Sequence, residues 1–304
     1  MQLGLDPCHI CPRDCGVSRR TTTGYCGAPQ ELEAAAICIH RGEEPPFSGL
    51  VNVFFPHCNL HCIYCQNRAI SGRQVDGNYI HYRGLEAIAD RIAELLPNSN
   101  GILGLVTASH YAPLLPSLLS AVQSRGVRPT VLYNSSGYER VDALQSLEGL
   151  VDIYLPDLKY LDADAAGTYS HAPDYPLVAT AALKEMQRQV GASLKVDAEG
   201  VAFRGMAVRH LVLPGLVENS LQVIDWLADN LPHQVPVSLM SQYYPPTKDL
   251  PMPLNRRLKR EEYEQVCRRC TERGLVQGWR QDLESEGCYR PDFSVKDNPF
   301  EPII

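Results

Sequence analysis

The feature that most constrains this chain is a short loop with three cysteines, Cys58, Cys62 and Cys65, spaced as C-x3-C-x2-C. Three thiolates this close can hold three irons of a [4Fe–4S] cluster and leave the fourth iron open to a small molecule. A fully ligated electron-transfer cluster would need a fourth cysteine nearby, and none follows until Cys267. The alternatives are a zinc site or a chance group of buried thiols, but zinc sites normally pair two CxxC-like turns, and this loop has no second one beside it.

A second group of cysteines, Cys8, Cys11, Cys15 and Cys26, lies within residues 1–45. A loop-rich segment this short cannot bury much apolar surface, so a metal would have to hold it together. The four thiolates suit either one tetrahedral zinc site or one fully ligated auxiliary [4Fe–4S] cluster, and both remain open. We expect this segment to bind a metal.

The composition is that of an ordinary globular chain. Of its 304 residues, 44% are hydrophobic and 21% are charged, which suits one large domain with additions. The net charge of −7 argues against a nucleic-acid partner. No stretch approaches about 18 uninterrupted apolar residues, and the start of the chain lacks a signal-peptide core, so we expect no membrane partner and a cytoplasmic location. In that reducing compartment, eleven cysteines indicate metal ligation rather than disulfides.

Short β-rich runs alternate with helical stretches through the middle of the chain. The predicted strands are residues 51–55, 101–107, 130–134, 151–155, 206–213 and 235–240. The predicted helices are residues 85–96, 114–124, 139–147, 177–190, 221–231 and 260–273, and a hairpin is expected at 194–203. This alternation predicts a parallel sheet with right-handed crossovers. Six strands rather than eight predict an α/β fold with an open (βα)6 partial TIM barrel.

The sequence predicts three parts. Residues 1–45 are the cysteine-rich metal-binding segment, and residues 46–245 are the α/β core. Several prolines between residues 245 and 253 mark a loop at the end of the core. Residues 246–304 then form a C-terminal extension, with one helix closed by Gly274 and a surface tail.

The cysteine loop resembles that of the radical S-adenosylmethionine (SAM) superfamily, in which an aromatic residue, here Tyr64, precedes the third cysteine. The run Cys-Asn-Leu-x-Cys-x-Tyr-Cys-x-Asn is close to the form in pyruvate formate-lyase activating enzymes. The runs Cys-Pro-Arg-x-Cys-Gly, Gly-Tyr-Cys-Gly, Asn-x-Ser-Gly-Tyr-Glu and Asp-Ile-Tyr-Leu-Pro-Asp-x-Lys-Tyr resemble one branch, the iron–sulfur homologues of those enzymes. The resemblance covers essentially residues 1–275.

This resemblance implies a radical SAM core over residues 46–245, with a [4Fe–4S] cluster on the three cysteines and SAM bound to its open iron. An electron from a donor such as flavodoxin or ferredoxin then cleaves SAM into methionine and a 5′-deoxyadenosyl radical. The leading hypothesis is hydrogen abstraction from a protein or peptide, which in a true activating enzyme is a glycine of a glycyl radical enzyme. The alternatives are a small-molecule substrate, an iron–sulfur electron-transfer or sensing protein without SAM chemistry, and a structural zinc protein.

Ligands of parallel α/β barrels bind at the C-terminal ends of the strands, and the resemblance places the SAM contacts there. The candidates are Asn67, Thr107, Ser109, His110, Asn134, Ser136, Asp157, Lys159, Arg209 and Gln242. Asp157 and Lys159 share one side of an extended segment and could pair with each other and with SAM. Arg209, within a barrel strand, needs an anionic partner. The SAM carboxylate is the natural one, unless Arg209 faces outward toward a helix carboxylate.

The chain departs from the activating enzymes at several of these positions. No Gly-Gly-Glu run follows the second predicted strand, Asn134 stands at an aspartate position, and Gln66 and Gln242 stand at histidine positions. His110 is equally well explained as a loop or helix-cap histidine. These departures weaken the strict activating-enzyme hypothesis more than the hypothesis of cluster assembly.

Overall fold

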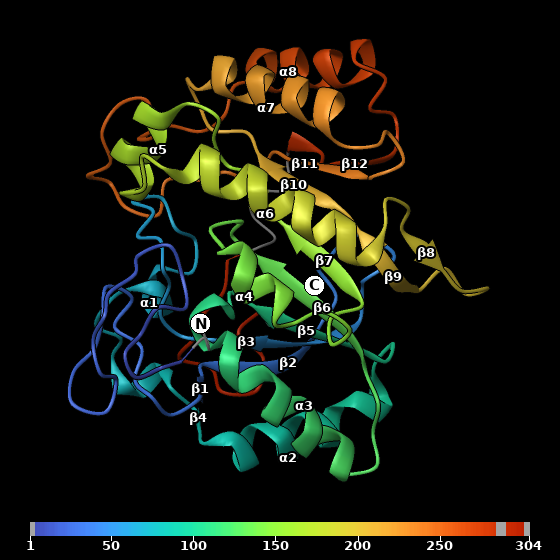
Figure 1. Cartoon of the computed structure of the whole chain (residues 1–304). Helices are drawn as coiled ribbons and strands as arrows, with labels where there is room; N and C mark the ends of the chain where they lie inside the picture. Colours follow the sequence, from blue (N-terminus) through green and yellow to red (C-terminus); the bar gives the residue numbers. More distant parts are fainter. Residues whose placement is uncertain (1–3, 284–289, 301–304) are drawn as a thin grey trace.

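The computed structural model describes residues 4–283 and 290–300, and in this part of the chain helices surround a curved, mostly parallel sheet (Figure 1). One parallel group contains, in spatial order, β3 (Leu50–Phe54), β5 (Ile102–Val106), β6 (Thr130–Ser135) and β7 (Ile153–Pro156). A second parallel group contains β10 (Val208–Leu211), β11 (Val237–Met240) and β12 (Gly278–Arg280).

The two groups form one continuous curved wall. β9 (Ala202–Met206) pairs with the start of β7 and is separated from β10 by a single residue. Beyond the end of β7, Asp157 forms a bridge with Arg209, and the Leu158 N–H donates to the Arg209 carbonyl oxygen at 2.9 Å. The expected α/β fold with a mostly parallel, partial-barrel sheet is therefore confirmed.

The helices cover the outside of this wall. They are α1 (Arg68–Ser71), α2 (Leu85–Leu95), α3 (Leu115–Ser124), α4 (Val141–Gln145), α5 (Ala163–Ser170), α6 (Tyr175–Val190), α7 (Val217–Asn230) and α8 (Arg260–Glu272). Short 3₁₀ turns occupy η1 (Gly77–Tyr79), η2 (Leu96–Asn98) and η3 (Ser109–Leu114). In α2, the buried residues Ile88, Ala89 and Ile92 fall on one face, as an amphipathic helix requires. Figure 1 shows α2 and α3 together on one side and α7 and α8 on the opposite side. No described helix is long and apolar enough to cross a membrane.

Several elements differ from the sequence-based expectation, among them β2 (Ala36–His40), β12 and α5. β2 pairs antiparallel with β3, so these residues form an edge strand of the main sheet rather than part of the cysteine-rich segment. β12 lies in the stretch predicted as a tail, and α5 was not predicted. β12 has three residues and the apolar residues of α5 are mainly alanines, so neither carries a clear hydrophobic period.

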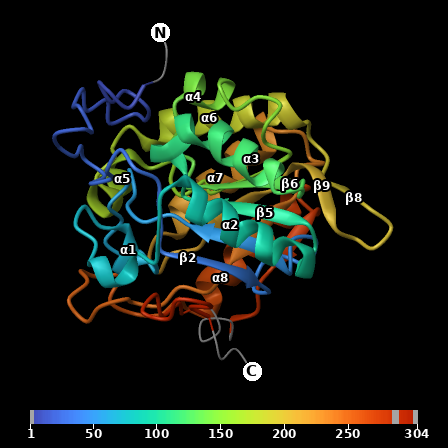
Figure 2. The ribbon, with the colours of Figure 1, turned by 90° about the horizontal axis from the view of Figure 1, so that it is seen from below.

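The remaining small elements are β1 (Glu33–Ala34), which pairs with β4 (Tyr82–Arg83), and β8 (Lys195–Val196), which pairs with β9. The antiparallel pairing of β8 with β9 confirms the expected hairpin. Residues 4–32 contain no helix and no paired strand beyond a bridge between Leu5 and Cys8. Figure 2 shows these N-terminal loops at one end of the sheet, near α5.

A glycine in the sheet makes room for a polar group inside the barrel. Gly104 of β5 lies beside Asn52 of β3, and a Cβ on Gly104 would lie 2.0 Å from the Asn52 Oδ1. Any larger residue would displace the amide. The Asn52 side chain donates from Nδ2 to the Glu43 carboxylate at 2.9 Å, so the sheet interior contains a polar cluster as well as apolar packing.

Candidate active site

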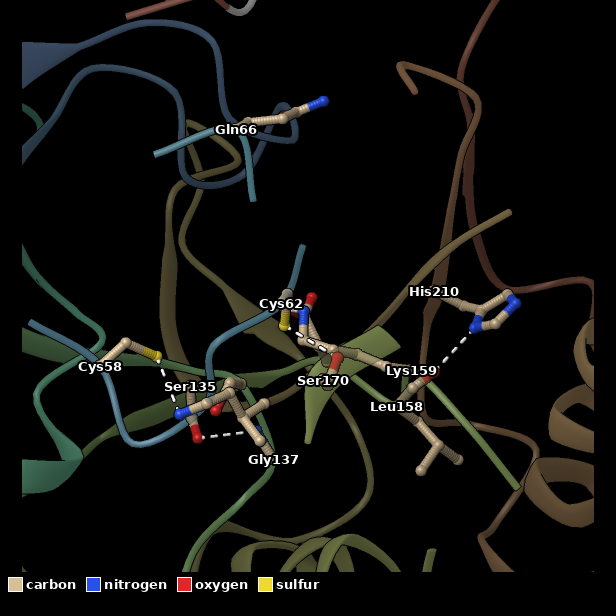
Figure 3. A network of polar contacts seen from close by, with 12 residues as sticks. Cys58, Cys62, Gln66, Ser135, Gly137, Leu158, Lys159, Ser170 and His210 are labelled. Atoms are coloured by element: carbon tan, nitrogen blue, oxygen red, sulfur yellow. Dashed lines mark hydrogen bonds and ion pairs between the residues drawn. The ribbon is translucent and has the colours of Figure 1, made fainter. Parts of the chain in front are cut away.

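The three cysteines of the C-x3-C-x2-C loop lie between the end of β3 and the start of α1. Each sulfur accepts one hydrogen bond: Cys58 Sγ from the Leu60 N–H at 3.3 Å, Cys62 Sγ from the Ser170 hydroxyl at 3.0 Å, and Cys65 Sγ from the Ser71 hydroxyl at 3.2 Å. Figure 3 shows the contact between Cys62 and Ser170. Donors aimed at sulfur stabilise a thiolate more than a thiol, so these surroundings fit metal-bound cysteines.

The electrostatics of the loop also favour a bound cation. Burial raises the pKa of Cys58, and the neighbouring Cys62 and Cys65 raise it further. Burial raises the pKa of Cys62 as well, against the opposing effect of Lys159. Three thiolates this close are costly without positive charge among them, which iron would supply. Among the described residues, no group of three or more His, Cys, Asp or Glu side chains is arranged to hold a metal ion as it stands, so ligation stays a prediction.

A cavity of about 220 Å³ opens beside the three cysteines, at the C-terminal ends of the parallel strands. The predicted SAM contacts that line it are Asn67, Thr107, Asn134, Ser136, Asp157, Lys159, Arg209 and Gln242. They come from the cysteine loop and from the ends of β5, β6, β7, β10 and β11. The fold thus gathers side chains that are far apart in sequence into one pocket, as the parallel-barrel arrangement predicts.

The polar groups of this cavity suit a polar ligand. The Ser136 hydroxyl is buried without a hydrogen-bond partner among the described residues. Thr107 follows β5 directly with a φ of 57°, which is uncommon for a β-branched residue, so the backbone at this position is constrained. The Lys159 ammonium pairs with the Asp157 carboxylate at 2.5 Å. Burial lowers the pKa of Lys159, but Asp157, Cys62 and Tyr175 together raise it more, so the net pKa is above its ordinary value and the Lys159 ammonium stays charged.

Ser109 and His110 do not line the cavity, which corrects the expectation from sequence. Both lie in η3, which turns into the protein after β5. The Ser109 hydroxyl donates to the Glu139 carboxylate at 2.5 Å, and the His110 Nε2 lies 2.8 Å from the Pro56 carbonyl oxygen. Burial holds the pKa of His110 well below its ordinary value, so this imidazole is a neutral, structural group.

Glu139 is a buried carboxylate that the sequence did not single out. It accepts hydrogen bonds from the hydroxyls of Ser109 at 2.5 Å, Ser135 at 2.6 Å and Tyr133 at 3.4 Å. Burial raises the pKa of Glu139 to about 7, although these three hydroxyls act in the opposite direction. The carboxylate thus connects η3, which follows β5, to the end of β6. Its sequence signal is weak, because a glutamate just before a helix normally lies in solvent.

Arg209 lies inside the barrel, but the chain itself supplies its anionic partners. The guanidinium donates from Nε to the Glu44 carboxylate at 2.8 Å and from Nη2 to both Glu43 and Glu44. The anionic partners of Arg209 are therefore Glu43 and Glu44. The sequence had suggested either the SAM carboxylate or, for an outward-facing Arg209, a helix carboxylate. Both glutamates lie in the loop between β2 and β3, so the contact spans most of the chain and leaves no local pattern.

A second cavity of about 420 Å³ adjoins the first. The residues that line both cavities are Gln66, Asn67, Val106, Asn134, Arg209, Met240 and Gln242. The Gln242 side-chain amide donates from Nε2 to the Gln66 Oε1 at 3.3 Å, and the Gln281 Nε2 donates to the Gln242 Oε1 at 2.7 Å. This chain of amides joins the cysteine loop to the ends of β11 and β12. Sequence reasoning missed the second cavity because it did not predict β12. Residues of β12 and the two that follow it, Trp279 to Asp282, form part of the cavity wall.

The four N-terminal cysteines are also brought together. Cys8, Cys11 and Cys26 are buried and Cys15 is partly buried. Burial and, to a smaller extent, the other three thiols raise the pKa of Cys11 to about 12. Cys15 Sγ accepts from the Tyr25 N–H at 3.2 Å and Cys26 Sγ from the Ala28 N–H at 3.5 Å. A metal at these four residues remains a prediction that their proximity and backbone donors support.

Comparison with known proteins adds a likeness of sequence and fold. No protein-family model matches the chain. The "Uncharacterized protein MJ0674" of Methanocaldococcus jannaschii is 29% identical over 267 residues, which cover 85% of this chain and 72% of that protein.

Among solved structures, a domain of pyruvate-formate lyase-activating enzyme from Bacteroides vulgatus matches at 14% identity and a TM-score of 0.41, over 57% of this chain and 92% of that domain. Streptococcus suis SuiB bound to S-adenosylmethionine matches at 11% and 0.47, over 75% of this chain and 49% of SuiB. HydG, a maturase of the [FeFe]-hydrogenase, matches at 13% and 0.46, over 79% of this chain and 53% of HydG. The chain thus spans about half the length of the latter two.

The likeness of the cysteine loop to the radical SAM superfamily stays a resemblance of sequence. At these identities and TM-scores the matches assign no residue a role, so the function rests on the site itself.

Proposed function

We propose that this chain binds a [4Fe–4S] cluster through Cys58, Cys62 and Cys65 and cleaves SAM reductively to abstract hydrogen from a substrate. The observation that carries the proposal is the joint placement of the three hydrogen-bonded sulfurs and a polar cavity at the C-terminal mouth of a parallel barrel. The cluster, when bound, supplies one electron to the sulfonium of SAM and breaks a carbon–sulfur bond.

The chain's own residues orient SAM and keep water out. The Asp157–Lys159 pair offers one charge of each sign to the amino-acid part of SAM. Asn67, Thr107, Asn134, Ser136 and Gln242 supply hydroxyls and amides along the rest of the cavity. The neutral His110 and the hydroxyl-bound Glu139 do not line the cavity. Their hydrogen bonds hold the segments that follow β5 and end β6 in place.

We place the substrate in the second cavity, which adjoins the SAM cavity through the wall of Gln66 and Gln242. The leading candidate is a peptide or protein segment, since the amide chain from Gln66 to Gln281 can exchange its hydrogen bonds with a peptide backbone. A glycine α-carbon, as in activating enzymes, is the most specific form of this proposal. A small molecule is the second candidate, because a cavity of about 420 Å³ is within the usual size of small-molecule sites.

Electron paramagnetic resonance of anaerobically purified, reduced protein tests the cluster and SAM together. We expect a [4Fe–4S] signal that changes when SAM is added, because SAM binds the open iron. Cys62→Ala should lose that signal, whereas Cys270→Ala, which changes a buried thiol of α8, should retain it. A signal indifferent to SAM would instead favour an electron-transfer or sensing protein, and zinc without iron would favour a structural zinc protein.

A further inference from the structure

The N-terminal cysteine loops contact the C-x3-C-x2-C loop through Arg13, which lies between Cys11 and Cys15. The Arg13 Nε donates to the Asn59 carbonyl oxygen at 2.8 Å, and its Nη1 donates to the His171 carbonyl oxygen at 2.7 Å. Asn59 follows Cys58 directly. His171 follows Ser170, whose hydroxyl donates to Cys62 Sγ. One guanidinium therefore fixes the backbone beside two of the three candidate cluster ligands.

Tyr25, the neighbour of Cys26, is a second residue of the N-terminal loops that contacts the C-x3-C-x2-C loop. Its ring stacks on His61 with centroids 4.4 Å apart and an interplanar angle of 17°. The Arg13 guanidinium carbon lies 3.9 Å from the Tyr25 ring centroid and 5.0 Å from that of Tyr138, so Arg13 contacts an aromatic ring on two sides. The Tyr25 N–H donates to Cys15 Sγ, which makes the same residue part of the N-terminal thiol cluster.

Residues 4–32 have little regular structure to hold Arg13 and Tyr25 in place. Both side chains are carried by turns whose ends are Cys11, Cys15 and Cys26. A metal on the four N-terminal thiols would fix those turns, because binding free energy at such a site is folding free energy. The same metal would then fix Arg13 and Tyr25 against the cluster loop.

We propose that metal binding at Cys8, Cys11, Cys15 and Cys26 is coupled to cluster binding at the C-x3-C-x2-C loop, with Arg13 and Tyr25 as the coupling residues. Each metal centre then increases the affinity for the other, since such coupling is reciprocal. The ligand of the N-terminal site is a thiophilic metal, zinc or iron. The proposal rests on the proposed function for the cluster loop, and it makes Arg13 a positioning residue rather than a catalytic one.

The first test compares cluster retention in anaerobically purified holoprotein. Arg13→Ala should release cluster iron to a chelator about tenfold faster than wild type, since it loses two hydrogen bonds and two ring contacts. Arg13→Lys should release iron at a rate between those of wild type and Arg13→Ala, because lysine keeps the charge but cannot donate to two acceptors in the geometry of a guanidinium. Arg20→Ala is the matched control, since Arg20 is on the same loops, is 70% exposed and pairs with Asp6. Iron release from Arg13→Ala at the wild-type rate, or equal acceleration by Arg20→Ala, would overturn the proposal.

The second test does not depend on the cluster. In a Cys58→Ala/Cys62→Ala/Cys65→Ala protein, hydrogen exchange of residues 58–65 is measured with the N-terminal site loaded with zinc and after its removal by a chelator. Zinc should slow this exchange, and adding Arg13→Ala should abolish the effect while zinc content stays unchanged. Absence of zinc binding, or exchange that does not respond to it, contradicts the coupling. If wild-type protein instead carries no cluster but zinc slows the exchange, the proposed function fails and the coupling of the two loops stands.

Discussion

Replacing Arg209 by methionine isolates the energetic role of the buried Arg209–Glu43–Glu44 cluster. The side chains of these residues are 12%, 9% and 8% exposed, so the substitution leaves two carboxylates buried without their cation. Breaking a buried ion pair from one side costs about 3–5 kcal/mol, and we expect a loss of that size in the free energy of unfolding at pH 7. Because the Asn52 amide still donates to Glu43, we expect the loss of unfolding free energy to be near the lower end of this range.

The pH dependence of this loss follows from the pKa of Glu43. Burial raises that pKa, but Arg209, together with His40 and the Asn52 amide, outweighs burial, so in the wild-type protein the pKa is below its ordinary value of 4.5. The wild-type pair therefore contributes stability above about pH 4.5 that is lost as the pH falls through the folded-state pKa. In Arg209→Met, only His40 and the Asn52 amide still oppose burial, so we expect the folded-state pKa of Glu43 to lie above 4.5 and the stability of the variant to fall as the pH rises past 4.5. The deficit relative to wild type is thus largest at pH 7 and shrinks toward pH 4.5.

Urea unfolding followed by far-ultraviolet circular dichroism at pH 5 and pH 7 measures both effects. Arg125→Met is the matched control, because Arg125 also pairs with two carboxylates, Glu86 and Asp90, that are 76% and 70% exposed, and it should cost much less stability than Arg209→Met. Adding Glu43→Gln and Glu44→Gln to Arg209→Met should restore much of the stability. A loss below about 1 kcal/mol, or an equal loss at both pH values, would refute the reasoning.

Three further changes test separate parts of the site. Ser170→Ala removes the hydroxyl that donates to Cys62 Sγ, and the cluster potential should become more negative in a redox titration; an unchanged potential contradicts this role. Gly104→Ala places a Cβ 2.0 Å from the Asn52 Oδ1 and should lower the free energy of unfolding by about 1–3 kcal/mol, which a wild-type melting temperature would exclude. Because burial raises the pKa of Glu139 to about 7 from 4.5, its contribution to stability falls as the pH rises from 4.5 to 7; Glu139→Gln should flatten that part of the stability profile, and an unchanged slope contradicts the assignment.

The sequence predicted the strands and helices whose own residues carry a clear hydrophobic period. It also placed Asp157 and Lys159 together, because their spacing is local and extended. The pairing of Arg209 with Glu43 and Glu44 could not be predicted, since more than half of the chain separates the partners and neither half carries a motif for the other. The same limit applies to β12, whose three residues have no period of their own.

The positions of Ser109 and His110 show a different limit. Their place just after a strand suggested the ligand site, but the 3₁₀ turn η3 points both side chains into the protein, where the Ser109 hydroxyl contacts Glu139 and the His110 Nε2 contacts the Pro56 carbonyl oxygen. A strand end indicates the edge of the site and not the direction of each side chain. Glu139 ends the run Asn-x-Ser-Gly-Tyr-Glu, but nothing in that run indicates that its carboxylate is buried, because one of the hydroxyls that donate to it comes from η3 and two come from β6.

The most direct test of the central claim is 5′-deoxyadenosine formation, measured by mass spectrometry with anaerobically reconstituted protein, SAM and a strong reductant. The assay is run with and without cell extract, so that a substrate required before cleavage is present. Wild-type protein should form 5′-deoxyadenosine and Cys62→Ala should form none. Absence of the product from cluster-loaded wild-type protein under both conditions would contradict SAM cleavage at the C-x3-C-x2-C loop.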